Sequence, residues 1–63
     1  MIRKGKWEHI RSGRVYDVLN TVKSQYGGEW IESVLYTDNQ GELYTRPLKE
    51  FKQKFTENVK TDN

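Results

Sequence analysis

The 63-residue chain has no cysteine, a single histidine, a single proline and no long hydrophobic run. The lack of cysteine excludes disulfide bridges and thiolate metal ligands. His9 has no second histidine at a metal-ligand spacing, so a histidine-based zinc site is excluded as well. A domain this short buries only about 60% of the surface that its unfolded chain exposes, so without such staples it depends on an efficient core.

Signals for export or membrane insertion are also missing from the sequence. Residues 1–4 are followed by no apolar segment, and no stretch approaches the roughly 20 apolar residues of a spanning helix. We therefore expect a cytoplasmic protein with no signal peptide and no membrane partner. The length allows one domain over 1–63. Within it we expect an ordered core over about 5–57 and a frayed C-terminal tail over 58–63.

Aromatic side chains are what the chain has in abundance. They supply large buried area per residue, and we expect them to take the place of the absent staples. Eight of them exceed what one small core accommodates, so some should reach solvent, and the tyrosines with their polar tips are the first candidates. The eight are Trp7, Tyr16, Tyr26, Trp30, Tyr36, Tyr44, Phe51 and Phe55.

Charge is unevenly distributed along the chain, although the formal net charge is only +2. Residues 1–28 carry six basic and two acidic side chains, a net charge of +4, whereas residues 29–47 carry one basic and four acidic side chains, a net charge of −3. A basic first half favours anionic partners, but the acidic middle opposes a broad nucleic-acid footprint. Ordinary solvated surface charge explains the same distribution equally simply.

The apolar pattern predicts four strands joined by short turns. The second strand shows apolar residues on both faces, which is typical of a bent strand in a small barrel. Glycines mark the connections, at Arg11–Gly13, Ser24–Gly28 and Asp38–Gly41. The expected strands are 6–10, 14–23, 29–37 and 42–46.

The C-terminal part combines a helix signal with a possible fifth strand. Leu48, Phe51 and Phe55 have the i, i+3, i+7 spacing of one helix face, and Pro47 is acceptable as a first helical residue. We expect a helical turn over 47–51, followed by a strand or a fraying helix over 52–57. The resulting fold class is mostly β: a small SH3- or Tudor-like antiparallel barrel of four to five strands. The alternative is an α+β fold, an antiparallel meander with a C-terminal helix packed on one face.

An ordered set of short motifs adds to this interpretation. The chain has Gly5-Lys6-Trp7-Glu8-His9, then Gly13, then Tyr16-Asp17-Val18, then Val34 and Tyr36, then Leu43-Tyr44-Thr45-Arg46-Pro47 and Phe51. This order resembles a family of short bacterial and phage proteins of unknown function, over about residues 5–52. The resemblance implies an SH3-like small barrel and brings no activity, cofactor or catalytic residue. The loop over 24–30 departs from the family pattern.

Catalysis finds little support in the residue types. Ser12 or Ser33 could be combined with His9 and Asp17, but triads are recognised by geometry and no spacing singles this set out. The Gly27-Gly28 pair leads into a predicted strand and not into a helix, so it does not read as a phosphate loop. We therefore expect no enzyme and no cofactor.

A binding surface is the better-supported expectation. Exposed aromatics bind by stacking or cation–π contact, and basic residues beside them extend the range of ligands. For His9 the simpler expectation is a half-buried structural ring, and for Arg46 an ion pair with Glu32 or Glu42. The candidate surface comprises Trp7, His9, Arg11, Arg14, Tyr16, Tyr26, Tyr36, Tyr44 and Arg46.

Three kinds of partner follow from these residues. The first hypothesis is a non-enzymatic module that contacts another protein, with an accessory or host-modulating role if its origin is bacterial or phage. The second is nucleic-acid binding through the basic first half, with Tyr16 or Tyr26 nearby and with strong salt dependence. The third is self-association as a structural protein. The basic residues meant here are Arg3, Lys4, Lys6, Arg11 and Arg14.

Overall fold

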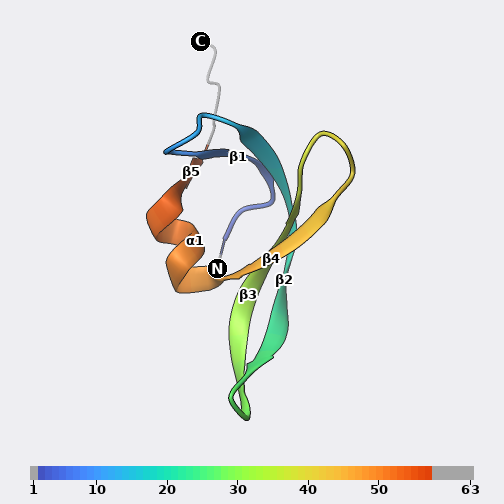
Figure 1. Ribbon diagram of the computed structural model, residues 1–63, viewed down its shortest axis with the longest axis vertical. Coiled ribbons are helices and arrows are strands. Elements are labelled where there is room, and N and C mark those ends of the chain that lie inside the picture. The colour runs from blue at the N-terminus through green and yellow to red at the C-terminus, as the bar shows by residue number, and fades with distance from the viewer. Residues whose placement is uncertain (1, 58–63) are drawn as a thin grey trace.

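The protein, described by a computed structural model over residues 2–57, is built from strands in one sheet and a short helix (Figure 1). All strand pairs are antiparallel, and the sheet is open with the order β4-β3-β2-β1-β5. The expectation of a mostly β fold with four to five antiparallel strands is confirmed, and the number is five; the expected tail lies outside the described residues. The elements are β1 (Gly5–His9), β2 (Val15–Tyr26), β3 (Glu29–Thr37), β4 (Leu43–Pro47), α1 (Leu48–Lys54) and β5 (Phe55–Glu57).

The β2–β3 hairpin is longer than the composition predicts. Ser24–Tyr26 continue β2 instead of forming a loop, and Gly27 and Gly28 alone make the turn, with φ of +53° and +87°. Positive φ at both central residues gives the tight turn whose twist matches that of the flanking strands, and glycine adopts it without steric cost. The hairpin therefore projects beyond the other elements as an arm (Figure 1), and we call residues 22–32 the hairpin arm.

A β-bulge bends the second strand, as its two apolar faces predict. Val18 pairs with Tyr36 and Asn20 pairs with Leu35, so Leu19 is the extra residue between them. By alternation Val18 points to the inner, core side of the sheet, while Leu19 and Asn20 both lie on the outer side. The bulge thus divides β2 into two parts. The first part covers the core, and the second extends past it into the hairpin arm.

The core is aromatic and lies on the inner side of the sheet. Phe51 is 0% exposed, stacks on Phe55 with ring centroids 4.0 Å apart and meets Trp7 edge-on at 5.4 Å. Tyr36 contacts both phenylalanines, at 5.2 and 5.3 Å. The buried cluster consists of Trp7, Val18, Val34, Tyr36, Phe51 and Phe55.

The helix and the last strand divide the C-terminal part between them. α1 continues to Lys54, beyond the expected helical turn over 47–51, and Phe55 then takes an extended conformation with φ of −128° and ψ of 151°. β5 begins there and pairs with β1. The helix is consequently not the last element, in contrast to the α+β alternative, and it links the two edge strands β4 and β5.

Phe51→Ala should reduce the free energy of unfolding by about 3–5 kcal/mol, the usual cost of removing a buried Phe. The loss follows because Phe51 contacts aromatic rings from three other positions of the core. Urea denaturation measures it. The control is Lys52→Ala on the exposed side of α1, for which we expect a change within about 0.5 kcal/mol. Equal stability of the two variants would contradict a core organised around Phe51.

Candidate functional site

The nine candidate residues do not form one surface. Trp7 and Tyr36 belong to the core, with 9% and 4% exposure, so they are not available for binding in the folded protein. This is a correction for those two residues, and its physical reason is that a chain without staples needs its largest rings inside. Tyr16 is half-buried against Tyr36 and Phe55. Four of the candidates are exposed to solvent as expected: Tyr26, Tyr44, Arg11 and Arg14.

An extended exposed apolar surface lies on the outer side of the sheet. Cross-strand partners share a face, so the pairs Asn20–Leu35 and Ser24–Ile31 place the outer residues of β2 and β3 next to each other. Diagonal neighbours then connect them from the base of the hairpin to its tip. We call this set the outer apolar strip: Leu19, Val22, Tyr26, Ile31, Leu35 and Leu43.

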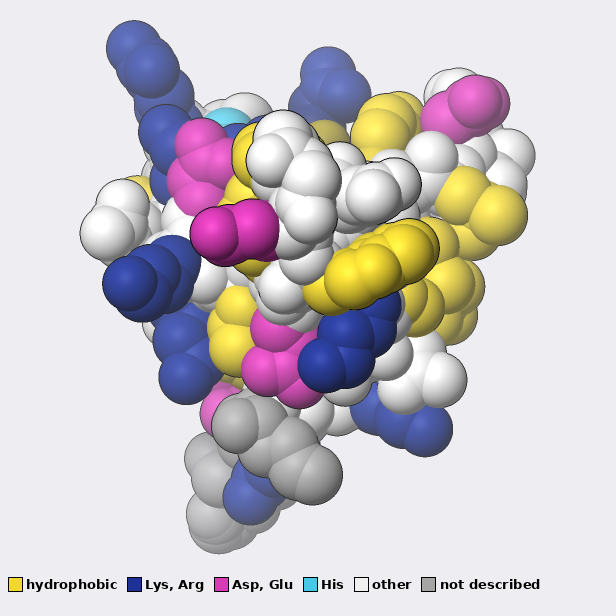
Figure 2. Space-filling model, turned by 90° about the horizontal axis from the view of Figure 1, so that it is seen from below, with side chains coloured by type: hydrophobic (Ala, Val, Ile, Leu, Met, Phe, Trp, Pro, Cys, Tyr) yellow, Lys and Arg dark blue, Asp and Glu magenta, His cyan; other side chains and the backbone are white. Residues whose placement is uncertain are grey.

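Exposure is greatest at the two ends of this strip. Tyr26 is 60% exposed at the tip, and Leu43 on β4 is 61% exposed. In the middle of the strip Ser33 is buried, and its hydroxyl oxygen has no hydrogen-bond partner among residues 2–57. In the view from below, hydrophobic side chains gather along one side of the molecule (Figure 2).

The tip of the hairpin arm carries an aromatic residue on each face. Trp30 pairs with Gln25 and Tyr26 pairs with Glu29, so the two aromatic rings lie on opposite sides of the ribbon. Trp30 is 64% exposed and was absent from the candidates, because its alternation with Val34 and Tyr36 assigns it to the core face. The signal that identifies it is its position next to the Gly27-Gly28 turn, which places it beyond the end of the core.

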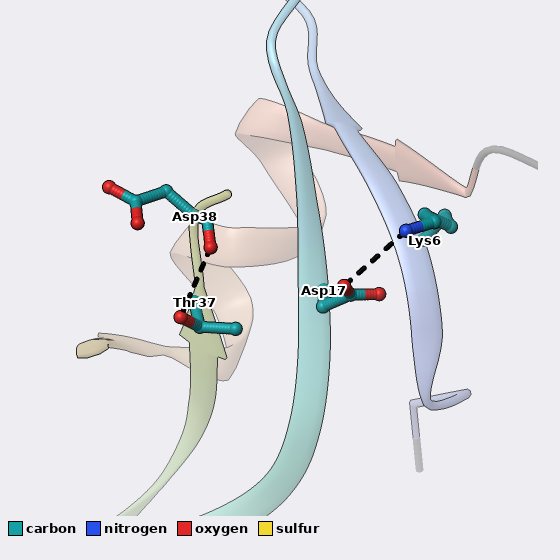
Figure 3. A network of polar contacts seen from close by, with 4 residues as sticks. All are labelled: Lys6, Asp17, Thr37 and Asp38. Carbon is teal, nitrogen blue, oxygen red and sulfur yellow. Dashed lines mark hydrogen bonds and ion pairs between the residues drawn. The ribbon is translucent and has the colours of Figure 1, made fainter. Parts of the chain in front are cut away.

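A polar cleft of about 550 Å³ lies across β1, β2 and the β3–β4 turn. Lys6, Asp17 and Thr37 form a row across three neighbouring strands, and Lys6 Nζ lies 3.4 Å from Asp17 Oδ2 (Figure 3). Arg14 and Asp38 also line the cleft. Its two cations are therefore balanced by two carboxylates, which leaves no net charge to select an ionic ligand.

Asp38 organises the turn between β3 and β4. Its Oδ1 accepts the backbone N–H groups of Gln40 and Glu42, and its Oδ2 accepts the hydroxyl of Tyr44, all at 2.9 Å. The Glu42 N–H is the main cause that lowers the pKa of Asp38 below its usual value of 3.8. The same hydroxyl–carboxylate bond raises the pKa of Tyr44, so this exposed tyrosine is held by the turn.

The serine, histidine and aspartate that the sequence offered as a possible catalytic triad do not come together in the structure. His9 Nδ1 lies 2.8 Å from the hydroxyl of Ser12, but the backbone N–H of Ser12 also points to Nδ1, at 3.3 Å. That N–H can only donate, which places the ring proton on Nε2 and makes the contact part of the β1–β2 turn. Asp17 accepts a hydrogen bond from Lys6 instead, and the Ser33 hydroxyl has no hydrogen-bond partner in the described part of the chain.

Arg46 forms neither of the ion pairs expected for it. Its Nε donates to the hydroxyl of Tyr36 at 3.2 Å, and its guanidinium lies 5.7 Å from the centroid of the Phe55 ring. The prediction failed because Arg46 points to the inner side of the sheet, where the hydroxyl of Tyr36 and the ring of Phe55 hold its guanidinium. With His9 and Arg11 it lines a second cleft, beside Lys54.

No group of three metal-ligating side chains occurs within residues 2–57. The helix of that part of the chain, α1, is too short and too polar to cross a membrane. Neither observation adds a site to the two clefts and the outer apolar strip.

In a Tyr44→Phe variant we expect the pKa of Asp38 to rise, because one donor to its charged form is removed. It should stay below 3.8, since the Gln40 and Glu42 N–H groups remain. A lowered carboxyl pKa stabilises the fold above the unfolded value, and that contribution is lost as the pH falls through the folded value. Carboxyl-carbon NMR titration measures the shift, with Tyr26→Phe as the control. A wild-type Asp38 that titrates at or above 3.8 would contradict the turn geometry.

Comparisons with protein-family models, with curated proteins and with solved structures find no match for this chain. The resemblance to short bacterial and phage proteins thus remains a hypothesis that rests on the ordered motifs alone. Any function has to be argued from the strip, the hairpin arm and the clefts themselves.

Proposed function

We propose that the protein is a non-enzymatic binding module that contacts another protein through the outer apolar strip and the tip of the hairpin arm. The supporting observation is the run of apolar side chains along one side of β2, β3 and β4, exposed at both ends. Soluble monomers rarely expose such contiguous apolar surface unless it serves an interaction. Trp30 and Tyr26 at the tip are of the residue types that most often dominate binding energy.

The charge of the hairpin arm favours a protein partner over a nucleic acid. The arm carries Lys23 against Glu29 and Glu32, a net charge of −1. A nucleic-acid surface needs cations placed along the path of the phosphates. An aromatic tip that carries more carboxylates than amines repels the phosphates instead. Lys23 and Glu32 also pair across the strands on the same face as Trp30, so this aromatic side chain has polar neighbours of the kind found at the rim of protein interfaces.

The basic first half gives the nucleic-acid alternative less support. Arg3 lies 3.4 Å from Glu57, and Lys6 lies 3.4 Å from Asp17, so two of its five cations already face carboxylates. Arg11 and Arg14 line different clefts. The positions of these basic residues therefore do not form the continuous basic stripe that would favour nucleic-acid binding.

The finer fold assignment belongs to the same proposal. The strand order β4-β3-β2-β1-β5, with a helical segment before the last strand, supports an SH3-like small barrel whose edges are bridged by α1. A bacterial or phage origin would suit a cytoplasmic accessory role. Fold alone does not define function, so the proposal depends on the strip.

The test compares three variants of the strip and tip, Trp30→Ala, Tyr26→Ala and Leu43→Ala, with wild type. A photo-reactive amino acid at position 30 first identifies the protein that is cross-linked in a lysate of the source organism. Calorimetry with that purified protein then measures affinity. We expect each variant to weaken binding by roughly thirtyfold, the effect of an interface hot spot, with little loss of stability because these side chains are exposed.

The matched control is Ile10→Ala, which removes an equally exposed apolar side chain from the β1–β2 turn, away from the strip. It should leave the affinity unchanged. If all four variants bind alike, or if only oligonucleotides are captured, the proposal is wrong. Sedimentation of the wild-type protein alone tests the remaining alternative, which is self-association. A concentration-dependent dimer that Leu43→Ala abolishes would show that the partner is a second copy of the chain.

A further inference from the structure

A second cleft, of about 400 Å³, lies between the β1–β2 turn, β4 and the end of α1. Its position differs from that of the outer apolar strip, because the β1–β2 turn lies at the end of the molecule away from the hairpin arm (Figure 1). Six residues from three segments of the chain line it: His9, Ile10, Arg11, Arg46, Gln53 and Lys54. Nothing in the proposed protein contact uses them.

The lining of this cleft contains three permanent cations and no carboxylate. Arg11, Arg46 and Lys54 contribute them. Within residues 2–57, none of the three lies in an ion pair, whereas Arg3 and Lys6 elsewhere both do. The first cleft provides an internal comparison, since its cations Lys6 and Arg14 are balanced by Asp17 and Asp38. Like charges from three separate segments repel one another, so their convergence is stabilised by an anion placed among them.

Arg46 is the anchored member of this group. Its Nε is fixed by the hydroxyl of Tyr36, and its guanidinium lies against the ring of Phe55. These contacts use one of its five N–H groups and leave the two terminal nitrogens to donate. A half-buried guanidinium held in one orientation is suited to bidentate contact with the oxygens of a phosphate or carboxylate.

The rest of the lining adds neutral donors. The hydrogen bonds of His9 leave its Nε2–H available, and Gln53 contributes a side-chain amide. Carbonyl groups near the end of α1 would repel an anion, but those of Phe51 and Lys54 are occupied by the N–H groups of Phe55 and Ile10. The cleft thus presents several donors, and its lining side chains include no carboxylate.

We propose that this cationic cleft binds one compact phosphate dianion, such as the phosphomonoester group of a small molecule or of a phosphorylated side chain. The three cations converge on a single cleft, so they match one multiply charged group. A polyanion with regularly spaced phosphates would need cations continuing along the surface. The carboxylate of Glu8, which lies near Gly13 in the adjacent turn, breaks such a path.

Inorganic phosphate is the first probe, titrated at constant ionic strength with chloride as the balancing ion and sulfate in a parallel series. Two-dimensional NMR should show saturable shifts of the Ile10, Arg11 and Lys54 amides and of the Arg46 Nε–H. Arg11→Gln and Lys54→Gln each remove a cation whose side chain is exposed, so both should fold normally. Each should weaken phosphate binding about tenfold, as expected on losing a hydrogen bond to a charged group.

Lys52→Gln is the matched control, because it changes the net charge equally from an exposed position on α1 that does not line the cleft. It should change the affinity less than twofold, in line with a screened surface charge. Phenyl phosphate and a phosphoserine peptide, compared with its unphosphorylated form, then distinguish the small-molecule source from the side-chain source. Shifts that do not saturate, or an equal loss of affinity in Lys52→Gln, would overturn the proposal.

Discussion

The stacking of Phe51 on Phe55 is the interaction on which the rest of the fold depends. The two rings are nearly parallel, with centroids 4.0 Å apart and an interplanar angle of 4°. Phe51 is in α1 and Phe55 opens β5, so the stack fixes where the helix ends and the last strand begins. Trp7, Tyr16 and Tyr36 then pack against these rings from β1, β2 and β3. A chain without cysteine, and hence without disulfides, obtains its cohesion in this way.

The small size of this core explains where binding surface is left over. The aromatic cluster covers the inner side of the sheet only as far as Val34, and α1 supplies the layer that faces it. The hairpin arm runs past this layer, so Trp30 on the inner face is left exposed, as Tyr26 is on the outer face. On the outer side, no other element of residues 2–57 covers the apolar strip. The outer apolar strip and the tip are thus exposed for the same reason, which is that a short chain can bury only a limited part of its apolar surface.

The two proposed sites differ in their physical basis and are separate in the fold. The strip would act through apolar burial, which is little affected by salt, whereas the cationic cleft would act through charge and hydrogen bonds. Arg46 connects the cleft to the core, because its guanidinium is held by Tyr36 and Phe55. An anion in the cleft would therefore be linked through Arg46 to the rings that organise the domain, while the arm would remain free for a partner.

The sequence by itself determined the strand order along the chain, the turns at Gly13, Gly27-Gly28 and Gly41, and the predominance of β structure, because these follow from local alternation and from positive φ at glycine. It also indicated an aromatic core and an excess of aromatic residues. Only the tertiary structure decided which aromatics are inside. Trp30 and Tyr36 share one strand face, yet Tyr36 is buried and Trp30 exposed, since the core ends between them. The convergence of Arg11, Arg46 and Lys54 was equally beyond local pattern, because side chains from three distant segments meet only once the sheet has curved around α1.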